Sequence, residues 1–138
     1  MTTRDKFSIL LTAACLFLLF PAVVVAADYT WSDNLDGTCE ITGYTGAGGD
    51  VSIPDTLGSL TVTSIGYQAF YNIDTLTIVS IPEGVTSIGD LVFRDCSNLI
   101  SVTISSSVTS IGDQTFYQCS SLTNVTIPEA VTYIGYVA

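Results

Sequence analysis

One stretch of this chain decides its fold, because residues 85–107 and 108–130 repeat each other: VTSIGDLVFRDCSNLISVTISSS and VTSIGDQTFYQCSSLTNVTIPEA. Phe93 returns as Phe116, an interval of 23, and the residues around it return at the same interval. A fixed period of about 20–50 residues is typical of repeat proteins, in which each repeat packs on its neighbours. The period therefore predicts a stacked solenoid.

The periodic array extends beyond this pair in both directions. Val62 begins a repeat one period earlier, and Val131 begins another one period later, which the sequence given does not complete. Residues 51–54 (VSIP) match residues 79–82 (VSIP) at an interval of 28, so the first repeat has a longer loop after Pro54. We assign residues 51–138 to the repeats, with the last repeat incomplete.

Each repeat contains two extended pieces. The pattern Leu-x-x-Val-x-Ile alternates with the period of a half-buried strand, so Val102 is expected to point inward and Thr103 outward. The pattern Val-x-x-Ile-Gly predicts a shorter extended piece that ends at a glycine turn. The segments that follow, such as residues 90–94, are too short for a helix and predict 3₁₀ or irregular turns. Stacking then aligns the Leu, Ile and Phe positions in buried columns.

The unit Ile-Pro-x-x-Val-x-x-Ile-Gly-x-x-x-Phe-x-x-Cys-x-x-Leu strongly resembles the BspA-type (Treponema pallidum-like) leucine-rich repeat of bacterial surface and secreted proteins. The resemblance covers residues 51–138, and residues 42–54 look like the entry to such arrays. It implies a mainly β, right-handed leucine-rich-repeat solenoid with one parallel sheet, no catalytic residues and, for some members, adhesion to host or matrix proteins. Ile73 departs from the pattern, because the later repeats have Cys there.

The first residues have the order of a secretory signal peptide. Two basic residues precede an apolar run at residues 7–20, and Pro21 and small residues up to Ala27 follow. This order of a basic start, an apolar centre and a small-residue end marks a cleaved leader. We therefore predict a signal peptide at residues 1–27 and a protein that is secreted or held at the cell surface.

Two other interpretations of this segment remain. Residues 7–27 are just long enough to span a bilayer as an uncleaved anchor. Lipidation at Cys15 is the other, and it is disfavoured because the apolar run continues beyond that cysteine.

Residues 28–50 predict an N-terminal cap and a glycine-rich link. Asp36-Gly37 is a strong tight-turn pair, which indicates a β-hairpin. Residues 43–49 are glycine-rich but lack the Lys and the spacing of a phosphate-binding loop. The acidic residues of the turn do not have the spacing of calcium ligands. Since a solenoid needs a cap over its open end, we expect the hairpin to cover the stack with Tyr29, Trp31, Ile41 and Tyr44.

The charge composition excludes several functions. The chain has three basic and 13 acidic residues, a net charge of −10, and no histidine. Removal of residues 1–27 would leave Arg94 as the only base and a net charge of about −11. Such a surface repels nucleic acid and anionic membranes, so we predict no nucleic-acid partner and no membrane contact after signal cleavage. Without histidine, Ser-His-Asp, Cys-His and His-metal sites are excluded, and we predict no enzyme activity and no cofactor.

Cys96 and Cys119 occupy the same position in adjacent repeats, which leaves three interpretations open. They are buried free thiols that fill volume, a disulfide formed in an oxidising compartment, or part of a metal site that lacks further ligands. Ile73 at the equivalent position favours the first interpretation, because an apolar residue substitutes there.

The outward strand positions form the candidate binding face. They are expected to align in two rows of neighbouring repeats, bordered at the strand ends by prolines and Ser105. Serine and threonine also simply suit an exposed strand, whereas regular threonine rows can bind ice or crystalline polymers. The residues of this face are Ser52, Ile78, Ser80, Ser101, Thr103, Asn124 and Thr126.

The sequence thus predicts a non-catalytic, adhesion-like interaction module that binds a protein or glycan. One alternative is that this chain is the N-terminal repeat portion of a longer secreted protein or enzyme, because the sequence stops just before the next Phe is due. A weaker alternative is an ice- or polymer-binding solenoid. We also expect that an uncapped last repeat favours end-to-end self-association.

Overall fold

The computed structural model describes residues 26–138, so most of the predicted signal peptide at residues 1–27 lies outside the described residues. No helix in this range is long and apolar enough to cross a membrane. The elements are η1 (Ala26–Asp28), β1 (Tyr29–Asp33), β2 (Thr38–Tyr44), β3 (Gly49–Ser52), β4 (Thr56–Leu57), β5 (Leu60–Ile65), β6 (Leu76–Ser80), β7 (Ser87–Ile88), β8 (Ser101–Thr103), β9 (Ser110–Ile111), β10 (Asn124–Thr126) and β11 (Tyr133–Ile134).

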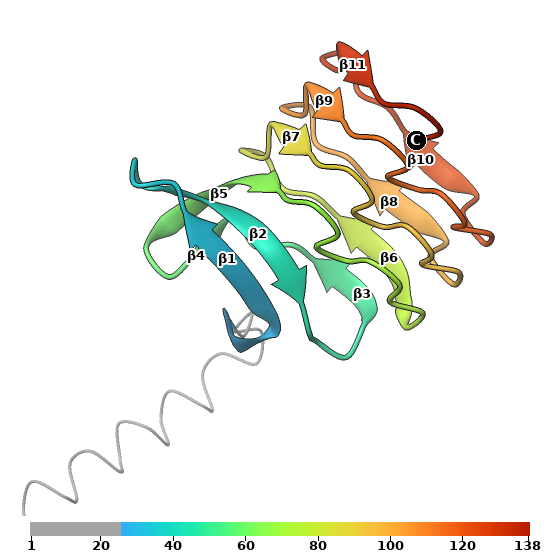
Figure 1. The fold of residues 1–138 in the computed structure, drawn as a ribbon, viewed down its shortest axis with the longest axis horizontal. Coiled ribbons are helices and arrows are strands. Elements are labelled where there is room, and N and C mark those ends of the chain that lie inside the picture. Colours follow the sequence, from blue (N-terminus) through green and yellow to red (C-terminus); the bar gives the residue numbers. More distant parts are fainter. Residues whose placement is uncertain (1–25) are drawn as a thin grey trace, which may run out of the picture.

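The chain winds into a mainly β solenoid in which each repeat forms one rung (Figure 1). A four-stranded parallel sheet has the order β3-β6-β8-β10. A seven-stranded sheet has the order β1-β2-β5-β7-β9-β11, with β4 paired to β5. The solenoid and its parallel sheet were predicted, but the prediction of one sheet was incomplete, because the structure has a second sheet. The short Val-x-x-Ile-Gly pieces also form a ladder, because their backbone groups meet the same partners in every rung.

The strand register confirms the repeat alignment. Val79 pairs with Val102, and Val102 pairs with Val125, so both pairings follow the period of the sequence. Val51 pairs with Val79 across β3 and β6, which confirms the longer interval at the first repeat. The first repeat therefore keeps its place in the sheet, and its extra residues lie outside the ladder.

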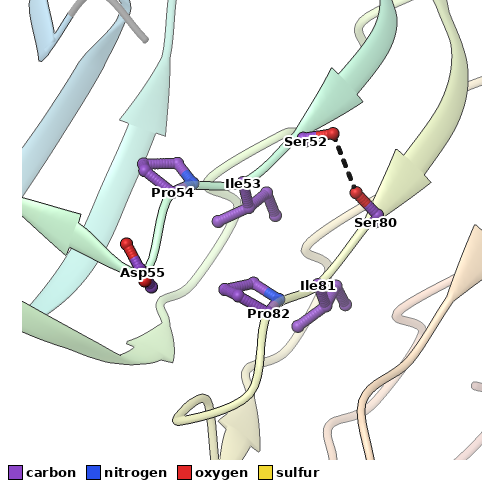
Figure 2. Close-up of a pocket in the computed structure, with 7 residues that line it drawn as sticks. All are labelled: Ser52, Ile53, Pro54, Asp55, Ser80, Ile81 and Pro82. Atoms are coloured by element: carbon purple, nitrogen blue, oxygen red, sulfur yellow. Dashed lines mark hydrogen bonds between the residues drawn. The ribbon is translucent and has the colours of Figure 1, made fainter. Parts of the chain in front are cut away.

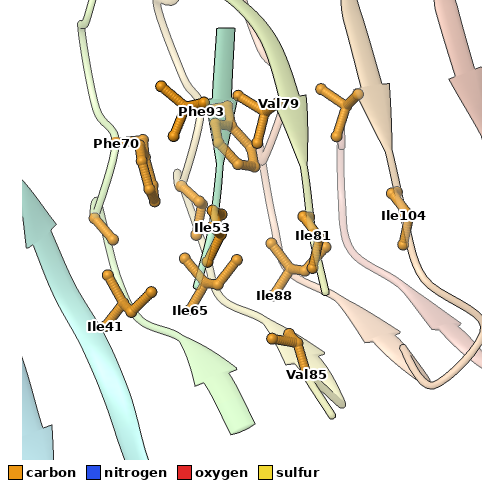
Figure 3. Close-up of a cluster of buried hydrophobic side chains, with 14 of the residues drawn as sticks. Ile41, Ile53, Ile65, Phe70, Val79, Ile81, Val85, Ile88, Phe93 and Ile104 are labelled. Atoms are coloured by element: carbon orange, nitrogen blue, oxygen red, sulfur yellow. The ribbon is translucent and has the colours of Figure 1, made fainter. Parts of the chain in front are cut away.

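The core consists of apolar columns that run through the rungs. Ile65, Ile88 and Ile111 are at most 2% exposed. The ring centroids of Phe70 and Phe93 lie 5.3 Å apart, and Phe116 continues the stack. Figure 3 shows Ile41, Ile65 and Ile88 of this core in a row from rung to rung. Each such buried side chain contributes about 1.5–3 kcal/mol of transfer free energy, so the columns hold both sheets in place.

The predicted N-terminal hairpin is confirmed. β1 and β2 are antiparallel, and β2 then pairs in parallel with β5, so the hairpin extends the seven-stranded sheet. Tyr29 and Ile41 are buried, and the Tyr44 ring stacks on Phe70 at 5.1 Å. The predicted cap role of Trp31 is wrong: this side chain is 37% exposed, because β1 is the outer strand and a bulge shifts its register after residue 30.

The segments that join the two sheets are irregular turns, as predicted. Gln68, Leu91 and Gln114 occupy the same place in successive rungs, and all have positive φ, between 52° and 61°. This conformation costs a non-glycine residue about 1–2 kcal/mol. The cost is offset between rungs, because Gln68 N donates to Asp90 O at 3.1 Å and Leu91 N donates to Asp113 O at 2.9 Å. Stacking therefore stabilises a turn that an isolated repeat would not keep.

Candidate binding face

The four-stranded sheet brings the predicted face residues together. Ser80 pairs with Thr103 and Thr103 with Thr126, while Ser101 lies between Ile78 and Asn124 in the next row. Ser52 extends the first row through its pairing with Ser80. The intervening Val79 and Val102 are buried, so the named residues lie on the opposite, outward side. The seven predicted residues thus share one face, with Ser80 and Ser101 half-buried and the others exposed.

Asp50 also lies on this face, although it is not among the seven predicted residues. Asp50 pairs with Ile78 and is exposed, so it heads the row of Ser101 and Asn124. Its place was readable from the alignment, because Asp50 precedes Val51 as Ile78 precedes Val79. Asp50 is the only charged residue in the four strands of this sheet.

Few side chains on this face are hydrogen-bonded to one another. Ser80 Oγ donates to Ser52 Oγ at 3.1 Å, and Thr77 Oγ1 donates to Asp50 Oδ1 at 2.9 Å. Both bonds join β3 to β6, at the edge of the sheet that is formed first in the sequence. Within residues 26–138, the side chains of Ser101, Thr103, Asn124 and Thr126 have no protein hydrogen-bond partner, so their polar groups remain available to water or to a ligand.

A threonine row on the seven-stranded side was also missed. Thr86, Thr109 and Thr132 lead into β7, β9 and β11 at the period of the repeat, and all three are exposed. Each hydroxyl donates to the backbone carbonyl of the preceding rung, at 3.1–3.3 Å. This second row is more regular than the predicted face, but its hydroxyl groups are used within the solenoid.

The cysteine column has a structural role. Cys96 Sγ donates to Phe70 O and Cys119 Sγ donates to Phe93 O, each at 3.0 Å, and both thiols are free. Burial raises the pKa of Cys96 to about 11 and that of Cys119 to about 12. Both thiols are therefore protonated at neutral pH, which agrees with buried free thiols rather than a disulfide or a metal site.

Several charged side chains of residues 26–138 make contacts within the fold. Among residues 26–138, no group of three or more Cys, Asp or Glu side chains is placed to hold a metal ion. Asp33 and Asp36 instead close the β1–β2 turn, where each Oδ1 accepts a backbone N–H. Arg94 Nε lies 3.4 Å from Asp95 Oδ2. The Arg94 guanidinium also stacks over Tyr117, with its Cζ 5.0 Å from the ring centroid.

A shallow groove of about 370 Å³ borders the face where β3 and β6 end (Figure 2). The strand pattern predicts the exposed Ser52 and Ser80 and the prolines at these strand ends, but it does not predict a groove there. Ser52 and Ser80 link the groove to the candidate face, because both belong to its first row. The full lining is Ser52, Ile53, Pro54, Asp55, Ser80, Ile81 and Pro82.

The two parallel ladders, the constant period and the apolar columns define a leucine-rich-repeat solenoid. The model of the family described as "BspA type Leucine rich repeat region" matches residues 50–138 in six copies. The chain therefore belongs to the BspA-type leucine-rich repeat family. A search of curated protein sequences found no match.

Solved structures of bacterial repeat proteins share the fold. The leucine-rich repeat protein of T. pallidum has a TM-score of 0.76 and 28% identity over 80% of this chain and 52% of its own. A leucine-rich cell surface protein of Faecalibacterium prausnitzii has a TM-score of 0.69 and 40% identity, over 78% of this chain and 31% of its own. A leucine-rich repeat protein of Bacteroides capillosus has a TM-score of 0.72 and 33% identity, over 78% of this chain and 83% of its own. The present chain thus spans about half the length of the T. pallidum protein.

Proposed function

We propose that this chain is a non-catalytic interaction module of an extracellular protein, and that it binds a protein or glycan partner through the outward face of the four-stranded sheet. One observation carries the proposal: the polar side chains of Ser101, Thr103, Asn124 and Thr126 lie in register on this face without a hydrogen-bond partner among residues 26–138. A free hydroxyl can form a new hydrogen bond with a ligand, whereas one already bonded within the fold has less to gain. This face is therefore better suited to ligand binding than the opposite one.

The rigidity of the sheet supports the same proposal. The strand backbones are fixed by ladder bonds and by the buried column of Val79 and Val102 beneath them. A preorganised surface loses little conformational entropy when it binds. The exposed Ile78 adds apolar area between the hydroxyl groups, which is the mixture that protein and glycan surfaces both complement.

The extracellular assignment rests on three features. Residues 1–27 have the order of a cleaved secretory leader. The F. prausnitzii structure is described as a leucine-rich cell surface protein. The acidic composition, with a net charge of −10, suits a protein that must stay soluble outside the cell.

An array of glycans and extracellular matrix proteins tests the proposed function. The test variant combines Thr103→Lys and Thr126→Lys on the proposed face. The matched control combines Thr86→Lys and Thr109→Lys, which replace exposed threonines on the other side. We expect the face variant to lose at least about tenfold in affinity for any partner found, a change of about 1.4 kcal/mol, while the control stays near the wild-type value. Equal loss in both variants, or no partner on the array, would contradict the proposal.

A further inference from the structure

The groove at the ends of β3 and β6 lacks the side-chain hydrogen bonds that join the equivalent turns of the next rung. There, Ser105 Oγ donates to Pro82 O at 2.8 Å, and Ser107 Oγ donates to Val85 O at 2.9 Å. Gly84 N donates to Ser107 Oγ at 3.2 Å. These bonds join the turn after β6 to the turn after β8.

Two sequence differences set the groove apart from this pair of turns. Pro82 stands where the following rung has Ser105, so no hydroxyl and no N–H is available there to reach the carbonyl of Pro54. The longer first repeat also sends its chain into the β4–β5 hairpin, in which Leu57 pairs with Leu60. Leu57 is buried and Val62 N donates to Asp55 O at 2.9 Å, so this hairpin is fixed to the solenoid. The groove is therefore a stable feature of the fold.

The lining of the groove has a definite chemical order. This lining is largely apolar, because it includes Ile53 and Ile81 and the rings of Pro54 and Pro82, which lie side by side on neighbouring rungs (Figure 2). The paired hydroxyls of Ser52 and Ser80 stand at one end. The exposed carboxylate of Asp55 stands at the other.

This order matches the surface of a sugar ring. The C–H face of a pyranose packs on apolar atoms, while its edge hydroxyls donate to a carboxylate and exchange hydrogen bonds with serine hydroxyls. The volume of about 370 Å³ lies in the range of small-ligand sites. Asp55 is the only charged residue of the lining, and Arg94, the only base among residues 26–138, is not part of it. The charge of the groove therefore disfavours an anionic ligand.

We infer that this groove binds a hexopyranose unit of a neutral glycan. The inference rests on the proposed function in one respect: Ser52 and Ser80 belong both to the groove and to the binding face. A sugar held at the strand ends can continue as a chain over the hydroxyl rows, so the groove would fix the position of a longer glycan on the sheet.

Saturation-transfer NMR and titration calorimetry test the inference with defined neutral hexasaccharides of β-1,3-glucan, β-1,4-glucan, α-mannan and β-galactan. Asp55→Ala removes the carboxylate, and Pro82→Ser supplies the hydroxyl that joins the equivalent turns of the next rung. The matched control is Glu129→Ala, because Glu129 is exposed and follows Pro128 as Asp55 follows Pro54. We expect at least a fivefold loss of affinity in each groove variant and less than a twofold change in the control. Amide spectra with wild-type dispersion verify that each variant folds.

The outcomes separate this inference from the proposed function. Absence of binding by every hexasaccharide, or equal affinity in wild type and both groove variants, overturns the groove assignment. If Asp55→Ala leaves sugar binding intact while Thr103→Lys with Thr126→Lys abolishes partner binding, the binding face is supported and the groove assignment is overturned. If the groove variants lose sugar binding while the face variant still binds every partner, the groove assignment is supported and the proposed binding face is overturned. Binding of a neutral peptide that competes at Asp55, with no sugar bound, also overturns the inference.

Discussion

The two sides of the solenoid are built from the same kind of ladder, yet they use their hydroxyl groups differently. On the seven-stranded side, the hydroxyls of Thr86, Thr109 and Thr132 donate to backbone carbonyls of the preceding rung. On the four-stranded side, Thr103 and Thr126 have no such partner among residues 26–138. A regular row of polar residues therefore does not by itself mark a binding face. What distinguishes the two sides is whether the polar groups are already hydrogen-bonded within the fold.

The largest effect is expected where both sides depend on one residue. Phe93 is buried between Phe70 and Phe116 in the column that supports both sheets. We predict that Phe93→Ala lowers the free energy of unfolding by about 3–5 kcal/mol, because it leaves a cavity in the stack. Urea denaturation measures this loss. Thr103→Ala serves as the surface control, and a similar loss in both variants would refute the supporting role of the column.

The thiols at the corner between the two sheets give a pH-dependent effect. Burial raises the pKa of Cys96 to about 11 and that of Cys119 to about 12, above the ordinary value near 9. Above pH 9 the unfolded chain loses these protons while the folded chain keeps them, so stability is expected to fall from about pH 9 to pH 12. Denaturation at a series of pH values measures the slope. The variant Cys96→Ala with Cys119→Ala should be less pH-dependent, and an unchanged slope would contradict the burial of the thiols.

Valine substitutions compare the two threonine rows directly. Thr86→Val and Thr109→Val each remove a hydroxyl that donates within the fold, so each should destabilise by about 0.5–1 kcal/mol. Thr103→Val and Thr126→Val remove hydroxyls that face only solvent, so they should change stability by less than about 0.5 kcal/mol. Thermal and urea unfolding of the four variants measures the difference. Equal losses on the two sides would remove the basis of the comparison.

The smallest expected effect concerns ice. Ser52, Ser80, Thr103 and Thr126 form a mixed row, and the more regular threonine row has its hydroxyls bonded to the backbone. Neither side therefore presents a uniform array of free threonines. We predict no thermal hysteresis above that of an equally concentrated control protein, and a clear freezing-point gap would instead favour an ice-binding function.

Much of the fold followed from the sequence, because a repeat fixes register as well as strand positions. The sequence alignment predicts that Val79 pairs with Val102 and Val102 with Val125, and that Val51 lies at a longer interval, and the sheet confirms these pairings. The second ladder did not follow, because two-residue strands such as Ser87–Ile88 carry no alternation of their own. The exposure of Trp31 depends on a β-bulge, which the sequence pattern does not predict.

The binding face was predictable in position but not in chemistry. Its seven residues follow from strand alternation, and Asp50 follows from the same rule applied one residue earlier. Which hydroxyls remain unpartnered depends on distances between rungs, as for Thr109, whose hydroxyl reaches the carbonyl of Thr86 at 3.1 Å. The groove likewise differs from the next rung in bonds that Ser105 makes and Pro82 lacks. Such differences arise between rungs, and the pattern within one repeat does not contain them.

Mapping the contact surface of a partner tests the central claim most directly. Amide chemical shifts of the isotope-labelled chain are followed while a partner found on the array is added. Binding through the four-stranded face predicts that the largest changes fall on β6, β8 and β10, including Ser101 and Thr103, with β7, β9 and β11 little affected. Changes concentrated on the seven-stranded side, around Thr86 and Thr109, would contradict it.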